Sequence, residues 1–177
     1  MRVLVIEAPV PVVDLAEALG HLRVDGGLED SLITGMVAAA TGDAEAFTQQ
    51  VFAPRILEAR FDAFETARCV RLPSPPVIEI VAFTWRGSDG TWYEGDLTDI
   101  ELDGRDVVPT ARAPWTGTAF GPDSLRITYR AGYEDVPDQV RSAILLMTGF
   151  LYHNRGAETA DPPAAVAALL QPFRVYV

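Results

Sequence analysis

The hydrophobic positions repeat with a helical period near both ends of the chain and with a two-residue period in the middle. In residues 14–48, Leu, Ala, Ile and Val recur at spacings of three and four, which is typical of amphipathic helices. The run Asp25-Gly26-Gly27 interrupts this repeat once. Asp14 and Glu17 have the spacing of a capping box, in which each side chain accepts the other's backbone N–H. We therefore predict a helical hairpin over residues 14–48.

Gly35 and Gly42 lie inside the second helix of this hairpin. A glycine in a helix interior costs roughly 1 kcal/mol relative to alanine. The two glycines therefore predict either close packing against another helix or a break near Gly42.

Residues 51–133 alternate between apolar and polar positions, which is the pattern of half-buried strands. Turn residues such as Gly, Pro, Asp and Ser separate the alternating segments. The alternation predicts two sets of inward-facing side chains: Leu57, Ala59 and Phe61, and Leu125, Ile127 and Tyr129. We expect five to seven short antiparallel strands in this β-rich segment.

A third helix is predicted over residues 136–156, with Pro137 in its first turn and Gly156 at its end. Residues 143–152 are almost all apolar, so this helix must be covered on most sides. A linker and a short C-terminal helix follow in residues 157–177. The helix could be the central helix of a monomer, or a neighbouring copy could cover part of it.

Together these elements predict a single α+β domain over residues 1–177, a length that can bury a substantial core. The helical hairpin, the long third helix and the short C-terminal helix would form an α-helical core. The β-rich antiparallel insertion, residues 51–133, would lie between the second and third helices.

The net charge of the chain limits the classes of function that it can have. Fourteen basic residues oppose 25 acidic ones, for a net charge of −11. Affinity for nucleic acid comes mainly from Lys and Arg that neutralise phosphates, so sequence-independent DNA binding by the whole surface is disfavoured. Arg126, Arg130 and Arg141 are too dispersed to form a nucleic-acid patch. The four-residue apolar run at the N-terminus is too short for a signal peptide, and residues 143–152 are too few for a membrane span, so we expect a soluble protein made in the cytoplasm.

No set of residues has the spacing of a catalytic or metal site. Cys69 is the only cysteine and is expected to be a buried, inert thiol in a strand. His21 and His153 have no second ligand nearby and are expected at the surface. The acidic run 99–104 resembles the start of a calcium loop, but Thr110 stands where its closing Glu belongs, so a hairpin is the better interpretation. We predict no catalytic residue, cofactor or metal ligand.

Three aromatic residues flank a predicted turn: Trp85, Trp92 and Tyr93. Such residues usually form core or cross-strand pairs. The alternative is a hairpin that presents them to a partner, either on the tail side of an assembly or in a neighbouring subunit. The sequence leaves both interpretations open.

Three stretches, in this order and spacing, resemble the head–tail connector (adaptor) proteins of tailed bacteriophages, including those of gene transfer agents. They are LAEALGHLRVDGGLEDSLI near the start, RITYRAGYEDVPDQVRSAILLMTGFLYHNRG, and ALLQPFRV near the end. The resemblance covers most of the chain. The helix glycines Gly35 and Gly42 and the loosely matching residues 91–118 depart from the family.

The resemblance implies a structural protein without catalytic activity. Copies of the chain, usually twelve, would form a ring beneath the portal, join capsid to tail and continue the DNA channel. The implied partners are the portal protein, a tail-side stopper or terminator protein, and DNA that passes without specific binding. The implied location is the head–tail junction of a virion or gene-transfer particle assembled in the bacterial cytoplasm. A negative channel wall would let DNA slide.

Family members commonly grip the portal with their C-terminal segment, so the resemblance places the portal contact in the tail within residues 157–177. Its apolar residues are expected to be exposed, because a short helix cannot bury them alone. The predicted portal-binding residues are Leu169, Leu170, Phe173, Arg174, Val175 and Tyr176. Deleting residues from Pro172 onward is expected to leave the fold intact and abolish portal binding.

Two other functions remain open. A small soluble α+β ligand-binding domain or enzyme could hold an unrecognised pocket between the helices and the sheet. A DNA-packaging or regulatory protein that contacts DNA directly is opposed by the negative charge.

Overall fold

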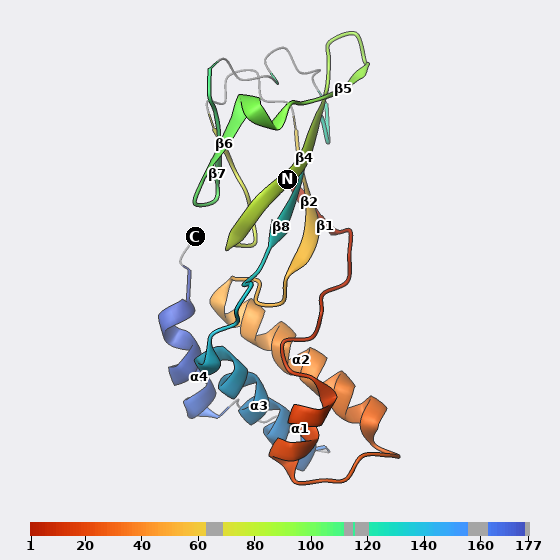
Figure 1. The fold of residues 1–177 in the computed structure, drawn as a ribbon, viewed down its shortest axis with the longest axis vertical. Helices are drawn as coiled ribbons and strands as arrows, with labels where there is room; N and C mark the ends of the chain where they lie inside the picture. Colours follow the sequence, from red (N-terminus) through yellow and green to blue (C-terminus); the bar gives the residue numbers. More distant parts are fainter. Residues whose placement is uncertain (63–68, 112–114, 116–120, 156–162, 176–177) are drawn as a thin grey trace. The chain divides into compact units, whose positions relative to one another are not determined.

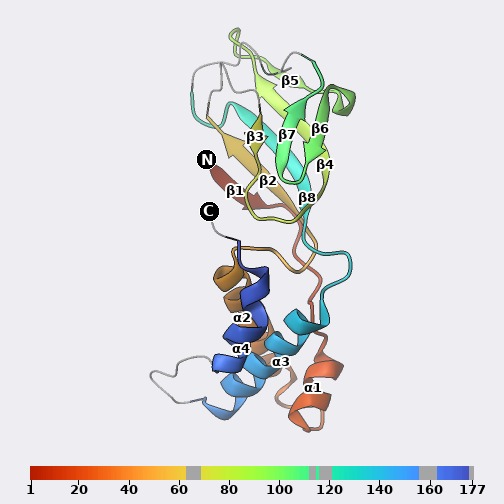
Figure 2. The ribbon, with the colours of Figure 1, turned by 90° about the vertical axis from the view of Figure 1, so that its left-hand side faces the viewer.

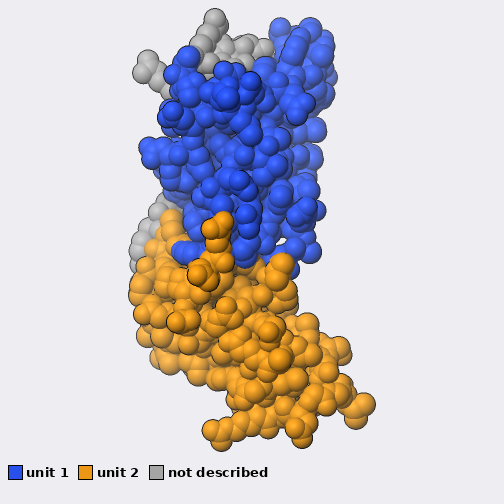
Figure 3. All heavy atoms as spheres, viewed as in Figure 1, with its two compact units in different colours: residues 1–9, 54–133 blue, residues 10–53, 134–177 orange. Residues whose placement is uncertain are grey.

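The computed structural model describes residues 1–62, 69–111, 115, 121–155 and 163–175. The chain divides into two compact units, coloured separately in Figure 3. The β unit comprises residues 1–9 and 54–133, and the helical unit comprises residues 10–53 and 134–177. Both units are therefore assembled from two separate pieces of sequence.

Among the described residues, the helical unit contains four α-helices and a short 3-10 helix, which Figure 1 labels in part. These are α1 (Leu15–Leu22), α2 (Asp30–Thr48), α3 (Asp138–His153), α4 (Ala164–Leu170) and η2 (Gln171–Phe173). Helix α3 contacts α1, α2 and α4, which explains its apolar sequence. The face that it buries consists of Val140, Ala143, Ile144, Met147 and Thr148. Leu146 remains 39% exposed, so the cover is incomplete.

The capping box at the start of α1 is only half formed. The Asp14 side chain accepts the Glu17 backbone N–H at 2.7 Å, as predicted. The Glu17 carboxylate does not return to the Asp14 backbone. It accepts a hydrogen bond from Arg141 Nη1 at 2.9 Å. A charged guanidinium on α3 offers a stronger, charge-assisted partner than a neutral N–H, and the contact joins α1 to α3.

The two helix glycines do not have the structural role that their cost predicts. Helix α2 runs without a break through Gly35 and Gly42. A Cβ atom added at either position would meet no atom within 4 Å. Both alternatives, close packing within the chain and a break near Gly42, are therefore wrong for the free chain. Its length and the burial of Ile33, Val37 and Ala40 keep the helix continuous.

The β unit contains a five-stranded antiparallel sheet in the order β1-β2-β8-β4-β5. Its strands are β1 (Arg2–Val5), β2 (Arg55–Phe61), β8 (Leu125–Ala131), β4 (Val77–Arg86) and β5 (Trp92–Glu94). The predicted inward-facing positions of β2 and β8 are buried and lie opposite one another: Leu57 pairs with Tyr129, Ala59 with Ile127 and Phe61 with Leu125.

A three-stranded sheet, in the order β3-β7-β6, covers one face of the five-stranded sheet (Figures 1 and 2). Its strands are β3 (Val70–Arg71), β6 (Ile100–Asp103) and β7 (Asp106–Pro109), with the 3-10 helix η1 (Leu97–Asp99) before β6. Phe83, Val107 and Trp115 are buried in this unit. The buried Tyr129 hydroxyl donates to the Pro73 carbonyl at 2.7 Å. The acidic run 99–104 forms the predicted hairpin.

Strand β1 was not predicted. Residues 2–5 pair with β2 and form one edge of the five-stranded sheet. The sequence signal is weak because four residues are too few to show a period. The pairing with β2 defines the strand, and this pairing depends on contacts 50 residues or more away in sequence.

The chain is a mixed α and β protein with antiparallel sheets, as predicted. In the described part of the chain, no helix is both long and apolar enough to cross a membrane.

Candidate interaction surfaces

The C-terminal helix α4 packs on the helical unit through one face. Val166 and Leu170 are 7% and 2% exposed, and α4 contacts α2 and α3. The expectation that the apolar tail residues are all exposed is therefore wrong for Leu170. Leu169 is half-buried, because its side chain lies on a different face of the helix.

The residues after α4 lie against the end of α2. The Val175 N–H donates to the Thr48 carbonyl at 2.9 Å, and Gln50 Nε2 donates to the Phe173 carbonyl. The Phe173 ring meets the buried Phe52 edge-on, with 6.4 Å between centroids. Phe173 and Val175 are half-buried. The tail is thus held by backbone and aromatic contacts within its own unit.

The guanidinium of Arg174 lies 5.3 Å from the centroid of the Phe47 ring. Arg174 is exposed, so this cation–π contact lies at the surface. Tyr176 lies outside the described residues. Of the predicted portal-binding residues that the structure describes, Arg174 is exposed and Leu170 is buried, and three are half-buried: Leu169, Phe173 and Val175.

A cavity of about 220 Å³ lies within the helical unit, between α2, α3 and α4. Side chains of Ala40, Ala44, Phe47, Met147 and Leu170 are among those that line it, and Asp43 is its one charged lining residue. Small-molecule sites usually measure about 300–1,000 Å³ and carry several converging polar groups. This cavity is smaller and almost wholly apolar, so it lacks the features of a catalytic pocket.

The aromatic residues of the β4–β5 hairpin form a stack. The Trp85 ring lies 5.8 Å from Phe83 on one side and 5.8 Å from Tyr93 on the other. Phe83 is buried and meets Trp115 edge-on. A Cβ atom on Gly95 would collide with Phe83, so only glycine fits there. The cross-strand interpretation is therefore confirmed for Trp85 and Tyr93.

Tyr93 ends the stack, and Trp92 points to the opposite face of the hairpin. Trp92 and Tyr93 are 42% and 43% exposed. The Tyr93 hydroxyl donates to Asp89 at 2.9 Å, and this bond raises the pKa of Tyr93. Two hydrogen bonds lower the pKa of Asp89: the larger effect comes from the Thr91 backbone N–H, and the next from the Tyr93 hydroxyl. These bonds hold the hairpin turn and leave one partly exposed aromatic ring on each face of the hairpin.

Glu29 joins the α1–α2 loop to the end of α3. Its carboxylate accepts from Arg155 at 2.6 Å and 3.1 Å and from the Tyr152 hydroxyl at 2.7 Å. The Arg155 guanidinium and the Tyr152 hydroxyl hold the pKa of Glu29 at about 2, against an ordinary 4.5. Sequence reasoning missed the contact between Glu29 and Arg155, because the two residues lie 126 positions apart.

The residues with metal-binding or nucleophilic chemistry are scattered. His21 and His153 are exposed, as predicted. Cys69 is exposed and not buried, because Val70 and Leu72 point inward and the two-residue period turns Cys69 outward. Among the described residues, no three His, Cys, Asp or Glu side chains gather as a metal site would require.

No known protein family and no curated protein matches the sequence. Solved structures do match. One is a chain of the "virion of native gene transfer agent (GTA) particle", with a TM-score of 0.83, 22% identity, and coverage of 100% of this chain and 97% of that chain. Two others come from necks of GTA particles. The neck of the empty particle, computed with C6 symmetry, gives a TM-score of 0.80 at 20% identity. The neck of the native particle, computed with C12 symmetry, gives 0.79 at 19%. Both cover 100% of this chain and 97% of the other.

This likeness shows a fold shared along the whole chain. The resemblance to gene transfer agent proteins is thus confirmed at the level of the fold.

Proposed function

We propose that this chain is a structural head–tail connector (adaptor) in the neck of a gene-transfer particle or virion. The observation that carries this proposal is the end-to-end match in fold to a chain of a GTA neck, at a TM-score of 0.79–0.80. The common fold therefore supports a common structural role.

In this proposal, copies of the chain form a ring, which the C6 and C12 symmetry of the similar necks supports. Twelve is the number that we propose. The helical unit would be the core of each subunit, and the β unit would be the insertion between α2 and α3. Contacts between two different surfaces of neighbouring copies close into a ring when the rotation per copy allows it.

The proposed partners are the portal protein on the capsid side and a stopper or terminator protein on the tail side. DNA would pass through the ring without specific binding, which suits a net charge of −11. The ring would lie at the head–tail junction, and the particle would be assembled in the bacterial cytoplasm. The role is one of binding and support and involves no catalysis.

We assign the portal contact to the C-terminal segment. Leu170 anchors α4 in the helical unit, while Leu169 and Arg174 remain accessible. Phe173, Val175 and Tyr176 complete the proposed contact. The β4–β5 hairpin, with Tyr93 stacked on Trp85 on one face and Trp92 on the other, is the proposed second interface, toward the tail or a neighbouring copy.

Co-sedimentation with purified portal rings tests the portal contact. Removing residues from Pro172 onward would also remove the bonds to Thr48 and Gln50, so loss of binding could reflect a loosened helical unit. The variant Leu169→Asp/Arg174→Glu changes accessible side chains and keeps Val166 and Leu170. We expect it to bind portal at least about tenfold more weakly, because charged groups would replace an apolar and a cationic contact.

Glu101→Arg, an exposed change on β6, is the control and is expected to bind like the wild type. Circular dichroism and thermal unfolding of each variant check that the fold persists. A wild-type chain that does not sediment with portal rings contradicts the adaptor role. Unchanged binding by the double variant contradicts only the placement of the contact.

The alternative, a small ligand-binding domain or enzyme, would use the cavity between α2, α3 and α4. Its volume of about 220 Å³ and its apolar lining suit a single hydrophobic side chain or a very small apolar molecule. This alternative would be favoured if small hydrocarbons raised the melting temperature of the chain and portal rings did not.

A further inference from the structure

One face of the five-stranded sheet carries two arginines beside Trp92 that the proposed second interface does not include. The three-stranded sheet covers the other face. At the hairpin end, Trp92 pairs directly with Arg86, and Thr84 pairs with Arg126. Residues paired in register, and residues two apart on one strand, point to the same face of a sheet. Arg86, Trp92 and Arg126 therefore lie together, and we call them the Arg-Trp patch. Glu94, which also pairs with Thr84, points to the same face.

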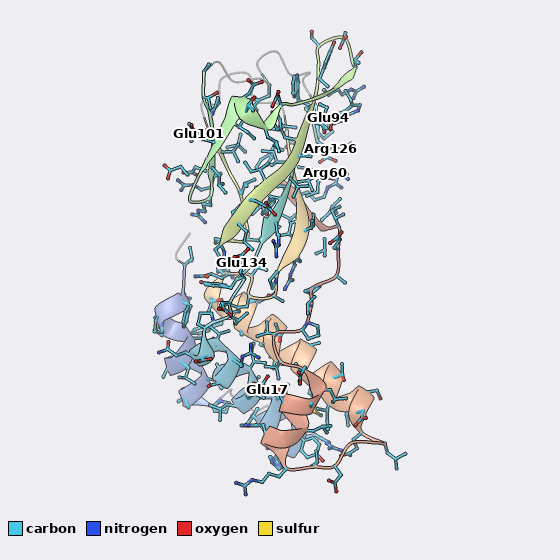
Figure 4. The ribbon with its side chains drawn as sticks, viewed as in Figure 1. Glu17, Arg60, Glu94, Glu101, Arg126 and Glu134 are labelled. Carbon is cyan, nitrogen blue, oxygen red and sulfur yellow. The ribbon has the colours of Figure 1, made fainter. Side chains whose placement is uncertain are left out.

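The arginines on this face differ in their partners. Arg126 lies opposite Arg60, which in turn lies opposite Arg2 (Figure 4 labels Arg60 and Arg126). Arg60 binds Glu58 at 2.6 Å and Asp123 at 3.6 Å, and Arg2 also binds Asp123. These two guanidinium groups are thus neutralised within the chain.

Arg86 and Arg126 form no ion pair with any residue that the structure describes. The Arg86 side chain donates only to the Gly90 carbonyl, at 3.2 Å. Arg126 lies over the Trp92 ring, with 4.1 Å between its Cζ atom and the ring centroid. Its Nε atom is buried and has no acceptor in the described part of the chain.

The geometry suits a carboxylate. Stacking on Trp92 holds the guanidinium plane of Arg126, and the planar fork of an arginine binds carboxylate groups through two parallel hydrogen bonds. Trp92 adds apolar surface at 42% exposure. Trp and Arg side by side are the residue types that most often dominate binding energy at protein interfaces.

The chain itself carries the matching surface. The helical unit contains twelve acidic residues and four arginines, a net charge of −8, whereas the β unit contains thirteen acidic residues and ten arginines. Asp135 and Asp138, at the start of α3, are exposed and have no partner among the described residues. Figure 4 labels Glu134, which directly precedes Asp135 in the sequence.

We propose that the Arg-Trp patch of one copy binds the exposed carboxylates at the start of α3 in a second copy. The two surfaces are different, so the contact is heterologous and can close into a ring. This inference rests on the proposed ring and adds to it the side chains that join neighbouring copies. Duplex DNA is the competing anion, but a net charge of −11 repels it.

Charge-swap variants test this contact in sedimentation-velocity experiments over a range of concentrations. We expect Arg86→Glu/Arg126→Glu and Asp135→Arg/Asp138→Arg each to weaken self-association at least about tenfold, because each places like charges opposite one another. The combination of all four substitutions should restore association, since the charges again match. High salt should weaken the wild-type contact.

The control Arg23→Glu/Arg105→Glu changes the net charge by the same amount as the patch variant, at sites away from the patch. It should associate like the wild type, and circular dichroism should show all variants folded. If the wild type self-associates and the patch variant self-associates equally well, this inference is overturned, whereas the proposed ring is not. A wild type whose copies neither associate in solution nor cross-link to one another on portal rings overturns both the patch contact and the ring. Binding of a fluorescent DNA duplex that Arg86→Ala/Arg126→Ala abolishes would show that the patch takes phosphate, and would also overturn the inference.

Discussion

At the scale of single residues, the contacts that stabilise the helical unit join positions far apart in sequence. Arg141 on α3 donates to the Val12 carbonyl and to Glu17, both at 2.9 Å. Glu29 receives Arg155 and Tyr152 from the other end of α3. Each end of α3 is thus tied to the α1 region by an arginine that bonds a carboxylate, a charge-assisted contact with defined geometry.

Glu29→Gln is expected to lower the melting temperature at pH 7, because the amide cannot accept two charge-assisted bonds from Arg155. The folded state lowers the pKa of Glu29 from 4.5 to about 2. A lowered pKa means that the ionised group stabilises the fold above about pH 4.5 and loses this contribution as the pH falls towards 2. The gap between wild type and variant should therefore shrink across that range. Thermal unfolding at several pH values measures it.

Glu101→Gln serves as the control, because Glu101 is exposed on β6 and no residue in the described part of the chain is bonded to its carboxylate. This variant should melt like the wild type at every pH. A gap for Glu29→Gln that stays constant down to pH 2 would contradict the assigned role of the Arg155 contact.

At the scale of elements, α2 shows that the packing of a buried face can determine where a helix forms, rather than the average helix propensity of its residues. Ile33, Val37, Ala40 and Ala44 are buried along one side, and this packing keeps the helix continuous through two glycines. Neither glycine has a positive φ or a close neighbour, so the free fold has no use for them.

Gly35→Ala and Gly42→Ala should each stabilise the free chain by about 0.5–1 kcal/mol, because alanine loses less backbone entropy and meets no clash. Urea unfolding measures the change. Gly104→Ala is the contrasting control. Gly104 has a φ of +62° in the β6–β7 turn, so alanine there should destabilise the chain. Destabilisation by either α2 substitution would mean that these glycines have a role in the free fold.

At the scale of the whole molecule, the unequal division of charge is the main feature. The helical unit has a net charge of −8, and the remaining −3 belongs to the β unit. The β unit is nearly balanced because ten of the fourteen arginines lie in it. An assembly of identical copies can therefore match a positive patch to a negative surface without any other protein.

We expect the chain to show no saturable binding of duplex DNA at physiological salt, up to about 100 µM protein, because a net charge of −11 opposes contact with phosphates. Fluorescence anisotropy with a labelled duplex measures this, and a basic DNA-binding protein provides the positive control. Saturable binding that falls steeply with added salt would contradict the assignment of a passive channel wall.

The sequence by itself determined the class of the fold and most of its elements. Leu57, Ala59 and Phe61 alternate along β2, and the period of two can bury only one face of a strand, so their inward direction follows from the sequence. The helical spacing in α1, α2 and α3 is equally local information.

Only the tertiary structure decided which side chains find partners. It buried Leu170 and left Leu169 accessible, added β1 to the sheet edge, turned Cys69 outward, and left Arg126 stacked on Trp92 without a carboxylate. Each of these outcomes depends on residues brought together from distant parts of the chain. Periodicity reports which face of an element is apolar, but not what that face will meet.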